Sequence, residues 1–459
     1  MLSRPAVEPG APPSPNGHYP NRHAANGAGT NGKGPNGHGV NGWPAGDLAA
    51  TVPLIPRDQI SRYRILKVAP TSFFADYGCH VRILEEMFAL QELGSQLTIC
   101  TYSTGRDLPG FDIRRSLPTP WCNGVQVGSS MHKLYFDALL SLQVTWTGLW
   151  QRPDLVHAHL HEGALIGHLA SLPRRVPLIF DFQGSLTSEM LDHNFLDRSS
   201  RFYRPLRWLE SRINLWADAI ITSSHNAAGI LIEEFGYPHE RVYPVPDGVN
   251  TERFRPKWQV DSSRLEELRA ELGLPSDKRI VVYLGLLAEY QGSSHLLNAA
   301  AELLRRRDDL HFLIMGYPGD QRYRLHADLI GIGRHCTFTG RLPYEQAPDY
   351  LALGDVAVSP KVSETEGNGK LLNYMALGLP TATFDTPVSH EILGDLGVYA
   401  ETGNASALAE AIELLLDEPT SSERSQQLRL RAEQQFSWTA AGCKMLAVYD
   451  TVCQKSGKC

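Results

Sequence analysis

Short β-rich runs alternate with helical segments through most of the chain. From Arg64 onward, runs rich in branched and aromatic residues end at polar or glycine loops, and apolar positions then recur at helical spacing. The expected strands of this first series are residues 64–70, 96–102, 154–159, 177–182 and 219–223, and the expected helices are 81–93, 163–172 and 203–216. This alternation predicts a parallel sheet with helices on both faces.

The same alternation restarts after a break at residues 244–278, where we place a hinge. The expected strands of the second series are residues 280–284, 311–315, 336–339, 356–359 and 381–384, and the expected helices are near 295–306, 321–330 and 345–353. Open parallel sheets bind ligands outside the carboxyl ends of their strands. The pattern therefore predicts an α/β protein with two Rossmann-like domains that face a central cleft.

The two ends of the chain depart from this alternation. Asn-Gly pairs and few apolar residues make residues 1–58 an expected disordered tail, because the segment cannot bury enough surface to offset its ordering entropy. A G-x-G-x-x-G match at Gly37, Gly39 and Gly42 lacks the flanking strand and helix of a dinucleotide site. The expected division is this tail, a first domain at 59–245, a second domain at 246–431, and a terminal helical segment at 432–459 that packs back on the first domain.

Charge and cysteine content narrow the class of protein. The net charge is −7 and the isoelectric point about 6.2, which disfavours a dedicated nucleic-acid binder. The seven cysteines show no C-x-x-C spacing, as in proteins of a reducing compartment without structural zinc. The chain start lacks a basic region followed by an apolar run, and no apolar stretch approaches the ~20 residues of a membrane helix. We therefore expect a cytoplasmic protein.

One segment raises the alternative of peripheral membrane contact. Residues 198–216 mix arginines with aromatic side chains, and a basic aromatic helix can lie on an anionic membrane, here the inner face. The ordinary explanation is an amphipathic helix that packs Leu209, Ile213 and Trp216 on the sheet.

The most informative segment runs from Ser359 to Pro380. An expected strand ends there, a polar loop carries Glu364 and Glu366, and a glycine-flanked turn opens a helix. Free backbone N–H groups at the start of that helix suit a phosphate, and Lys370 adds a positive charge. Glu366 can accept hydrogen bonds from sugar hydroxyls. The alternative is a plain helix cap whose acidic residues stabilise the helix dipole.

This segment resembles the donor-site signature of glycosyltransferase family 4, a retaining family of GT-B fold. The end of the signature, M-A-x-G-x-P, matches residues 375–380. Further similarities lie in the glycine-rich loop that ends at Gly78, the strand 217–224, and the interdomain motif at residues 246–256, in which Asn and Asp are exchanged. The resemblance covers nearly all of the chain after the tail.

The resemblance implies roles for individual residues. The first Glu of the signature maps to Glu366, with Glu364 as its rival, and the second maps to Asn373, a departure from the carboxylate that grips the nucleotide ribose. The implied catalytic residues are His159 and Glu366, and the implied donor-binding residues are Gly78, Gly367, Asn368, Gly369, Lys370, Leu371, Asn373 and Arg341. For Arg341 a plain surface role is the alternative.

A histidine at a strand end is the candidate on the first domain. In the family, the His that ends a D-[IV]-[IV]-H-x-H strand faces the reacting sugar, and this implies His159, with His161 as the substitute. A structural role is the alternative, because a lone histidine is more often structural.

One departure bears directly on catalysis. Many family members carry G-R-x-x-x-x-K-G after the first strand of the second domain, and both basic residues clamp the donor diphosphate. Leu286 and Gln291 stand at these two positions here. Without them, two positive charges that would stabilise the leaving diphosphate are missing. Either Lys370 stabilises it instead, or activity is weak or absent.

The sequence therefore predicts transfer of a hexose from a nucleoside diphosphate sugar to a hydroxyl acceptor, with retention. No D-x-D or metal-spaced His/Asp cluster occurs in the sequence, and the resemblance implies an enzyme that needs no metal and no cofactor besides the sugar nucleotide. The alternatives are a nucleotide-sugar epimerase and a non-catalytic glycosyltransferase-like subunit that binds nucleotide or partner proteins.

Overall fold

The structure, a computed structural model, describes residues 62–76, 78–118, 133–192, 195–363, 367–418 and 423–457. The expected tail with its glycine motif, as well as Glu364 and Glu366, lies outside these residues.

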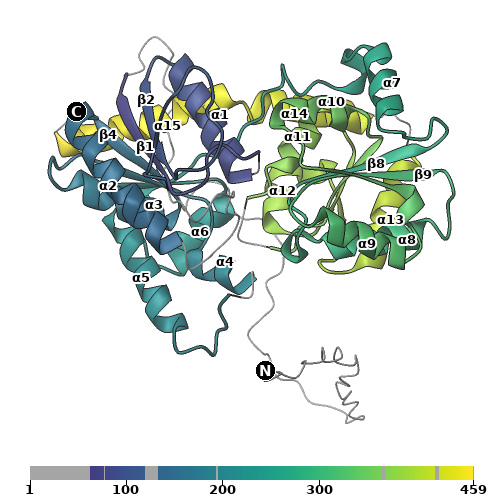
Figure 1. The fold of residues 1–459 in the computed structure, drawn as a ribbon, viewed down its shortest axis with the longest axis horizontal. Coiled ribbons are helices and arrows are strands. Elements are labelled where there is room, and N and C mark those ends of the chain that lie inside the picture. The colour runs from purple at the N-terminus through teal and green to yellow at the C-terminus, as the bar shows by residue number, and fades with distance from the viewer. Residues whose placement is uncertain are drawn as a thin grey trace, which may run out of the picture. The chain divides into compact units, whose positions relative to one another are not determined.

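The first domain is built on a parallel sheet (Figure 1). Among the described residues it has seven strands in the order β3-β2-β1-β4-β5-β6-β7. They are β1 (Arg64–Ala69), β2 (Gln96–Thr101), β3 (Asp112–Arg115), β4 (Leu155–His159), β5 (Leu178–Phe182), β6 (Ala219–Thr222) and β7 (Val242–Pro244). Five of these strands are those expected from the sequence. The edge strands β3 and β7 were not expected, because each is short and lacks a clear apolar alternation.

Helices cover both faces of this sheet. One face packs against α1 (Gly78–Glu92) and α15 (Trp438–Ser456), with Ile65 of β1 and Leu446 of α15 in one buried cluster. The other face packs against α2 (Lys133–Gln151), α3 (Leu160–Ser171), α5 (Tyr203–Trp216) and α6 (His225–Glu233). Consecutive strand residues point to opposite faces, so Leu66 beside Ile65 packs on Phe136 of α2. The short helix α4 (Leu186–Asp192) follows β5.

The second domain repeats this architecture. Within the described chain its sheet has six parallel strands in the order β10-β9-β8-β11-β12-β13. They are β8 (Arg279–Leu284), β9 (Leu310–Met315), β10 (Cys336–Gly340), β11 (Val356–Ser359), β12 (Thr381–Phe384) and β13 (Val398–Ala400). The helices are α7 (Ser262–Glu271), α8 (Ser293–Leu303), α9 (Asp320–Leu329), α10 (Ala347–Ala352), α11 (Lys370–Ala376), α12 (Pro387–Leu393), α13 (Ala405–Leu416) and α14 (Glu423–Gln435).

The chain passes twice between the domains, and the two passages touch. The N–H of Val249 donates to the carbonyl of Phe436 at 2.8 Å. A Cβ on Gly248 would lie 2.5 Å from the nitrogen of Trp438, so only glycine permits this approach. The helix that returns to the first domain starts at Trp438 rather than at residue 432, because α14 ends at Gln435 and packs on α11 of the second domain.

These features confirm the expected fold class, with two Rossmann-like domains and a terminal helix that crosses back. Asn404 caps α13 by accepting from the N–H groups of Ser406 and Ala407, as its position before an apolar run indicates. The long helix α2 was not expected from the sequence. Among the described helices, none combines the length and the apolar character needed to cross a bilayer.

Candidate functional site

A cavity of about 350 Å³ lies between the two domains. Its wall on the first domain comes from segments that follow β1, β4, β5 and β6, and its wall on the second domain from segments that follow β8, β9, β10 and β11. Every one of these segments leaves the carboxyl end of a parallel strand, which is where open α/β sheets bind ligands. The cavity is therefore the candidate active site.

Lys370 and Gln291 form the charged corner of the second-domain wall. Nζ of Lys370 donates to Oε1 of Gln291 at 2.7 Å and lies 4.8 Å from the centre of the Tyr283 ring. Gly285, at the end of β8, makes room for the ammonium, since a Cβ there would lie 2.9 Å from Nζ. Leu286 lines the cavity beside them. Lys370 thus points toward the loop after β8 and not outward along its helix.

A second lysine braces the loop before α11. Lys361 is buried, and its Nζ donates to the carbonyl of Gly367 at 2.7 Å. Asn368 is buried as well, and its amide group exchanges hydrogen bonds with the hydroxyl of Ser359 at the end of β11. Sequence reasoning assigned Lys361 no role, although its place two residues after a strand of a parallel sheet is a usable signal. The loop is held by these contacts at the cavity edge.

Six of the expected site residues line the cavity and three do not. The lining residues are Gly78, Gly367, Asn368, Gly369, Lys370 and Asn373. Leu371, Arg341 and His159 are absent from the walls. Glu366 falls outside the described residues, so its role and its ranking above Glu364 stay predictions from the sequence.

Leu371 and Arg341 are turned to other partners. The side chain of Leu371 is fully buried in the apolar core, and its N–H donates to the carbonyl of Asn368 at 3.0 Å. That amide is therefore already used and is not a free phosphate donor. Arg341 pairs with Asp76 of the first domain at 2.8 Å and stacks over Tyr317. It joins the domains beside the cavity.

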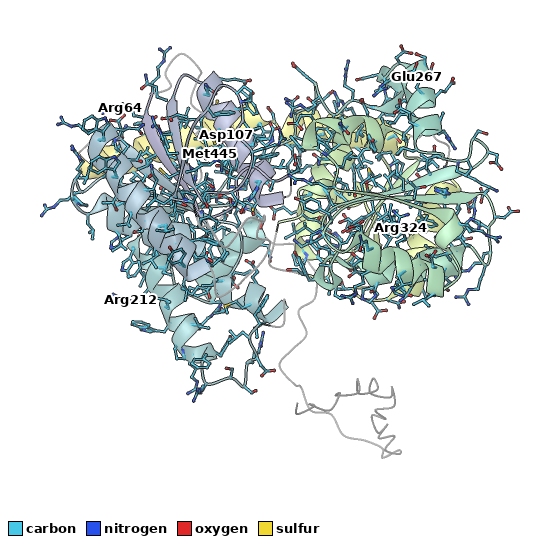
Figure 2. The ribbon with its side chains drawn as sticks, viewed as in Figure 1. Arg64, Asp107, Arg212, Glu267, Arg324 and Met445 are labelled. Carbon is cyan, nitrogen blue, oxygen red and sulfur yellow. The ribbon has the colours of Figure 1, made fainter. Side chains whose placement is uncertain are left out.

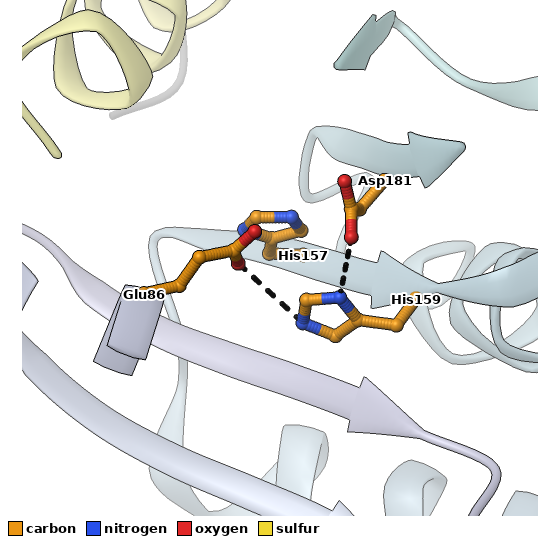
Figure 3. Close-up of side chains that lie close together, drawn as sticks. All are labelled: Glu86, His157, His159 and Asp181. Atoms are coloured by element: carbon orange, nitrogen blue, oxygen red, sulfur yellow. Dashed lines mark hydrogen bonds and ion pairs between the residues drawn. The ribbon is translucent and has the colours of Figure 1, made fainter. Parts of the chain in front are cut away.

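His159 lies in a buried ionic network under the first-domain wall (Figure 3). Its side chain is 0% exposed, Nδ1 donates to Asp181 at 2.8 Å, and Nε2 lies 3.3 Å from Nζ of Lys67. Burial, followed by the charge of Lys67, lowers the pKa of His159. The imidazole is therefore neutral, with its Nδ1 proton aimed at Asp181 and its Nε2 lone pair aimed at Lys67. The chain reaches the cavity two residues after the end of β4, where His161 of α3 forms part of the wall.

Arg82 links this network to the cavity. It pairs with Asp181 at 2.7 Å and with Glu86 at 3.1 Å, and its other guanidinium nitrogen contacts Asp247, which lines the cavity. Burial opposes ionisation of Asp181, but the charge of Arg82 and the hydrogen bond from His159 hold its pKa well below the usual range.

The same network brings together a set of groups with metal-ligand chemistry. Atoms of Glu86, His157, His159 and Asp181 lie within 4.8 Å of one another, although their sequence spacing gives no such hint (Figure 3). The carboxylates already have cationic partners, because Nζ of Lys67 lies 2.6 Å from Glu86 and Arg82 holds Asp181. A cation placed here would have to displace a buried lysine, so the residues do not fit a resident metal.

The first-domain wall carries polar groups that sequence reasoning did not single out. Lys133, the first residue of α2, pairs with Glu162 at 3.0 Å, and both line the cavity. Gln183 and Glu189 line it beside His161. Each follows a strand end or opens a helix, but no short motif marks them. The wall can therefore offer both hydrogen-bond donors and acceptors to a polyhydroxylated ligand.

Both domains match models of known families. Residues 77–248 match the glycosyl transferase 4-like domain, and residues 265–435 match the family described as glycosyl transferases group 1. The first match contains the first-domain wall after β1, and the second contains β8, the Lys370 corner and α11.

Curated relatives span most of the chain. A D-inositol 3-phosphate glycosyltransferase of Catenulispora acidiphila is 28% identical over 404 residues, which cover 81% of this chain and 90% of that protein. A 2-deoxystreptamine glucosyltransferase of Streptomyces kanamyceticus is 26% identical and covers 74% of this chain and 89% of its own length. A phosphatidyl-myo-inositol mannosyltransferase of Mycobacterium leprae is 24% identical, with 86% and 98% covered.

Solved structures share the fold at lower sequence identity. A sucrose-phosphate synthase of Thermosynechococcus elongatus has a TM-score of 0.71 at 18% identity and covers 86% of this chain and 100% of its own. The Anabaena protein HepE in complex with UDP-glucose has a TM-score of 0.66 at 15% identity, with 87% and 100% covered. These structures show that the fold is GT-B, and the two matched domains with the curated relatives show that the chain belongs to glycosyltransferase family 4.

Proposed function

We propose that this glycosyltransferase moves a hexose from a nucleoside diphosphate sugar to a hydroxyl acceptor, with retention at the transferred carbon. The single observation that carries the proposal is the Lys370 corner, where an ammonium group enters the cavity at the carboxyl end of β8. HepE, a protein of similar fold, is described in complex with UDP-glucose, which supports a nucleoside diphosphate hexose as donor.

The donor is assigned to the second-domain wall. The departing diphosphate gains negative charge as its bond to the sugar breaks, and a cation already in place stabilises that charge without reorganisation. Lys370 supplies a full charge, and Gly285 leaves room for its ammonium at the end of β8 because it carries no side chain. Asn373 lines the same wall and offers an amide to the nucleotide ribose.

The acceptor is assigned to the first-domain wall. Lys133, Glu162 and Gln183 offer hydrogen-bonding groups opposite the donor wall, which suits an acceptor with several hydroxyls. His161, the substitute for His159, forms part of the cavity wall, but its Nε2 is buried 3.6 Å from Glu210. Buried His159 supports the wall through Asp181 and Arg82.

The reaction needs no group beyond donor and acceptor. The bond between the sugar and the diphosphate breaks with its electron pair on the leaving oxygen, the acceptor oxygen bonds the same carbon, and the acceptor proton leaves with the diphosphate. Glu366 is proposed to hold the sugar hydroxyls, on sequence grounds alone. No metal is required in this scheme, since Lys370 provides the positive charge.

The test is a thermal-shift screen of the purified chain against UDP, GDP, ADP and their hexose conjugates, followed by an assay for nucleoside diphosphate release. The proposal expects one nucleotide to raise the melting temperature and its sugar conjugate to be hydrolysed slowly without acceptor. A nucleotide that binds while no conjugate is ever cleaved would make the protein a non-catalytic binding subunit.

A further inference from the structure

The outer surface of α2 is apolar where a surface helix is normally polar. Its inward residues Phe136, Leu140 and Val144 are buried against the sheet. Its outward residues include Leu142, Trp146 and Trp150, whose exposed fractions are 67%, 68% and 80%. A helix that is apolar on both faces is normally enclosed on both. The exposed apolar residues of α2 therefore indicate a surface that binds a partner when the protein functions.

The apolar surface continues onto neighbouring helices. The loop after α3 lies against the end of α2, because Arg174 donates to the carbonyl of Leu149 at 2.8 Å, and Leu172 is exposed beside it. Helix α3 also contacts α5, where His168 stacks on Trp216 with ring centres 4.9 Å apart. On α5, Trp208 is 64% exposed. We call this surface of α2, α3 and α5 the tryptophan face; the three helices are labelled in Figure 1.

Exposed arginines outnumber exposed carboxylates around the tryptophan face, where Asp218, which follows α5, is exposed near His168. Arg204 and Arg212 lie exposed on α5 and form no ion pair with any described residue; Arg212 projects from α5 in Figure 2. Arg152 and Arg175, at the ends of α2 and α3, are exposed as well. Exposed indoles with exposed arginines beside them are typical of protein surfaces that bind the interface of an anionic bilayer.

The carboxylates of these helices are turned away from the surface. Asp137 of α2 accepts from the hydroxyl of Tyr102 at 2.6 Å, and Glu162 of α3 pairs with Lys133. Glu210 of α5 is fully buried and accepts from Thr187. No carboxylate of the three helices is exposed, so the face is cationic despite the net charge of −7.

We propose that the tryptophan face binds the surface of an anionic lipid bilayer. The indoles and leucines enter the interfacial layer, and the arginines contact the lipid phosphates. A second copy of the chain is disfavoured as occupant, because a symmetric pair would bring the exposed arginines of both copies together, while no carboxylate of α2, α3 or α5 is exposed to neutralise them. The protein lies on the bilayer through this face, since the inward side of α2 packs on the sheet.

The test is flotation of the full chain with vesicles of phosphatidylcholine alone or mixed with phosphatidylglycerol, at low and high salt. The wild type is expected to float with anionic vesicles and to be released by salt. Trp146→Ser/Trp150→Ser and Arg204→Gln/Arg212→Gln are each expected to lower the partition coefficient by about tenfold or more. Matched controls on the second domain, Trp258→Ser and Arg305→Gln, are exposed residues and are expected to float like the wild type.

Melting temperatures of all four variants show whether they fold. Floating that survives Trp146→Ser/Trp150→Ser in a folded protein would overturn the proposal, and so would a wild type that stays with neither kind of vesicle. Dimerisation without vesicle binding, abolished by the same double substitution, would instead assign the face to a second copy. None of these measurements depends on transferase activity. The membrane proposal is therefore tested independently of the proposed function.

Discussion

The ammonium of Lys370 lies 2.7 Å from the amide oxygen of Gln291, the residue at which the family pattern described above has a lysine. The positive charge at this corner comes from α11, whose first residue is Lys370, and neither Leu286 nor Gln291 of the segment after β8 carries one. Gln291, itself buried, orients the ammonium through its carbonyl oxygen. The two departures from the family pattern, Leu286 and Gln291, remove charge from one element, and a neighbouring element supplies it.

Lys370→Met should lower turnover of the sugar nucleotide at least about tenfold, or about 1.4 kcal/mol of barrier, because the leaving diphosphate loses its cation. Methionine keeps the apolar stem over the Tyr283 ring. Steady-state kinetics would check this, with Lys278→Met as control, since that lysine lies away from the cavity and contacts the carbonyl of Asp308 and the carboxylate of Asp277. Leu286→Arg in the Lys370→Met background should recover part of the rate, because residue 286 lines the same cavity. Unchanged kinetics and nucleotide affinity in Lys370→Met would remove the lysine from the mechanism.

His159→Ala should destabilise the first domain, by about 3 kcal/mol. The substitution leaves buried Asp181 without its hydrogen bond and Lys67 without its nitrogen neighbour. Urea unfolding measures the loss. His168→Ala, at a half-buried histidine of α3 outside the network, serves as the comparison and should cost less. Equal costs for the two substitutions would mean that the network contributes nothing specific.

Asp137 should make stability depend on pH in a defined window. Burial raises the pKa of Asp137 to about 6, whereas an aspartate in the unfolded chain titrates near ~3.9. Between these values the folded state holds a proton that the unfolded state has lost, so this group lowers stability as the pH rises from about 4 to about 6.

Asp137→Asn removes that titration and keeps an oxygen acceptor for Tyr102. The variant should match the wild type below the window and exceed it above by about 2 kcal/mol. Urea unfolding of both proteins on each side of the window gives the difference, in which all other titrating groups cancel. A difference that does not change with pH would show that Asp137 titrates normally.

Chelation should leave the protein unchanged. Lys67 and Arg82 already neutralise the carboxylates of the buried cluster, so no metal is needed to hold Glu86, His159 and Asp181 together. Dialysis against EDTA is expected to alter neither the melting temperature nor donor turnover. Loss of either, restored by one divalent metal, would reverse this assignment.

The sequence pattern predicts much of the fold because parallel strands are buried on both faces. Runs such as residues 280–284 and 356–358 are continuous, apolar and followed by polar or glycine loops, so their position and direction can be inferred locally. The sequence pattern did not predict the helix α2. Its apolar residues occur on both faces, so no single period separates core from surface.

The site was predictable only where function sits in a contiguous motif. Gly367 to Lys370 follow one strand and open one helix, and all four line the cavity. His159 and His161 differ by two residues, and the positive φ of Leu160 between them, 62°, turns the chain from strand to helix there. That local turn decides which histidine meets the cavity. The pairing of Arg341 could not be inferred either, because its partner Asp76 lies in the other domain, far away in sequence.

The most direct test of the account is the release of nucleoside diphosphate by the purified full chain from UDP-, GDP- and ADP-hexoses, measured with and without a hydroxyl acceptor. Wild type should cleave one of these donors slowly in water and faster with the acceptor. Glu366→Ala should lose turnover by orders of magnitude, while Glu364→Ala should lose little. A well-folded protein that binds the nucleotide yet releases no diphosphate from any donor, with any acceptor, would contradict the account and leave a binding subunit in its place.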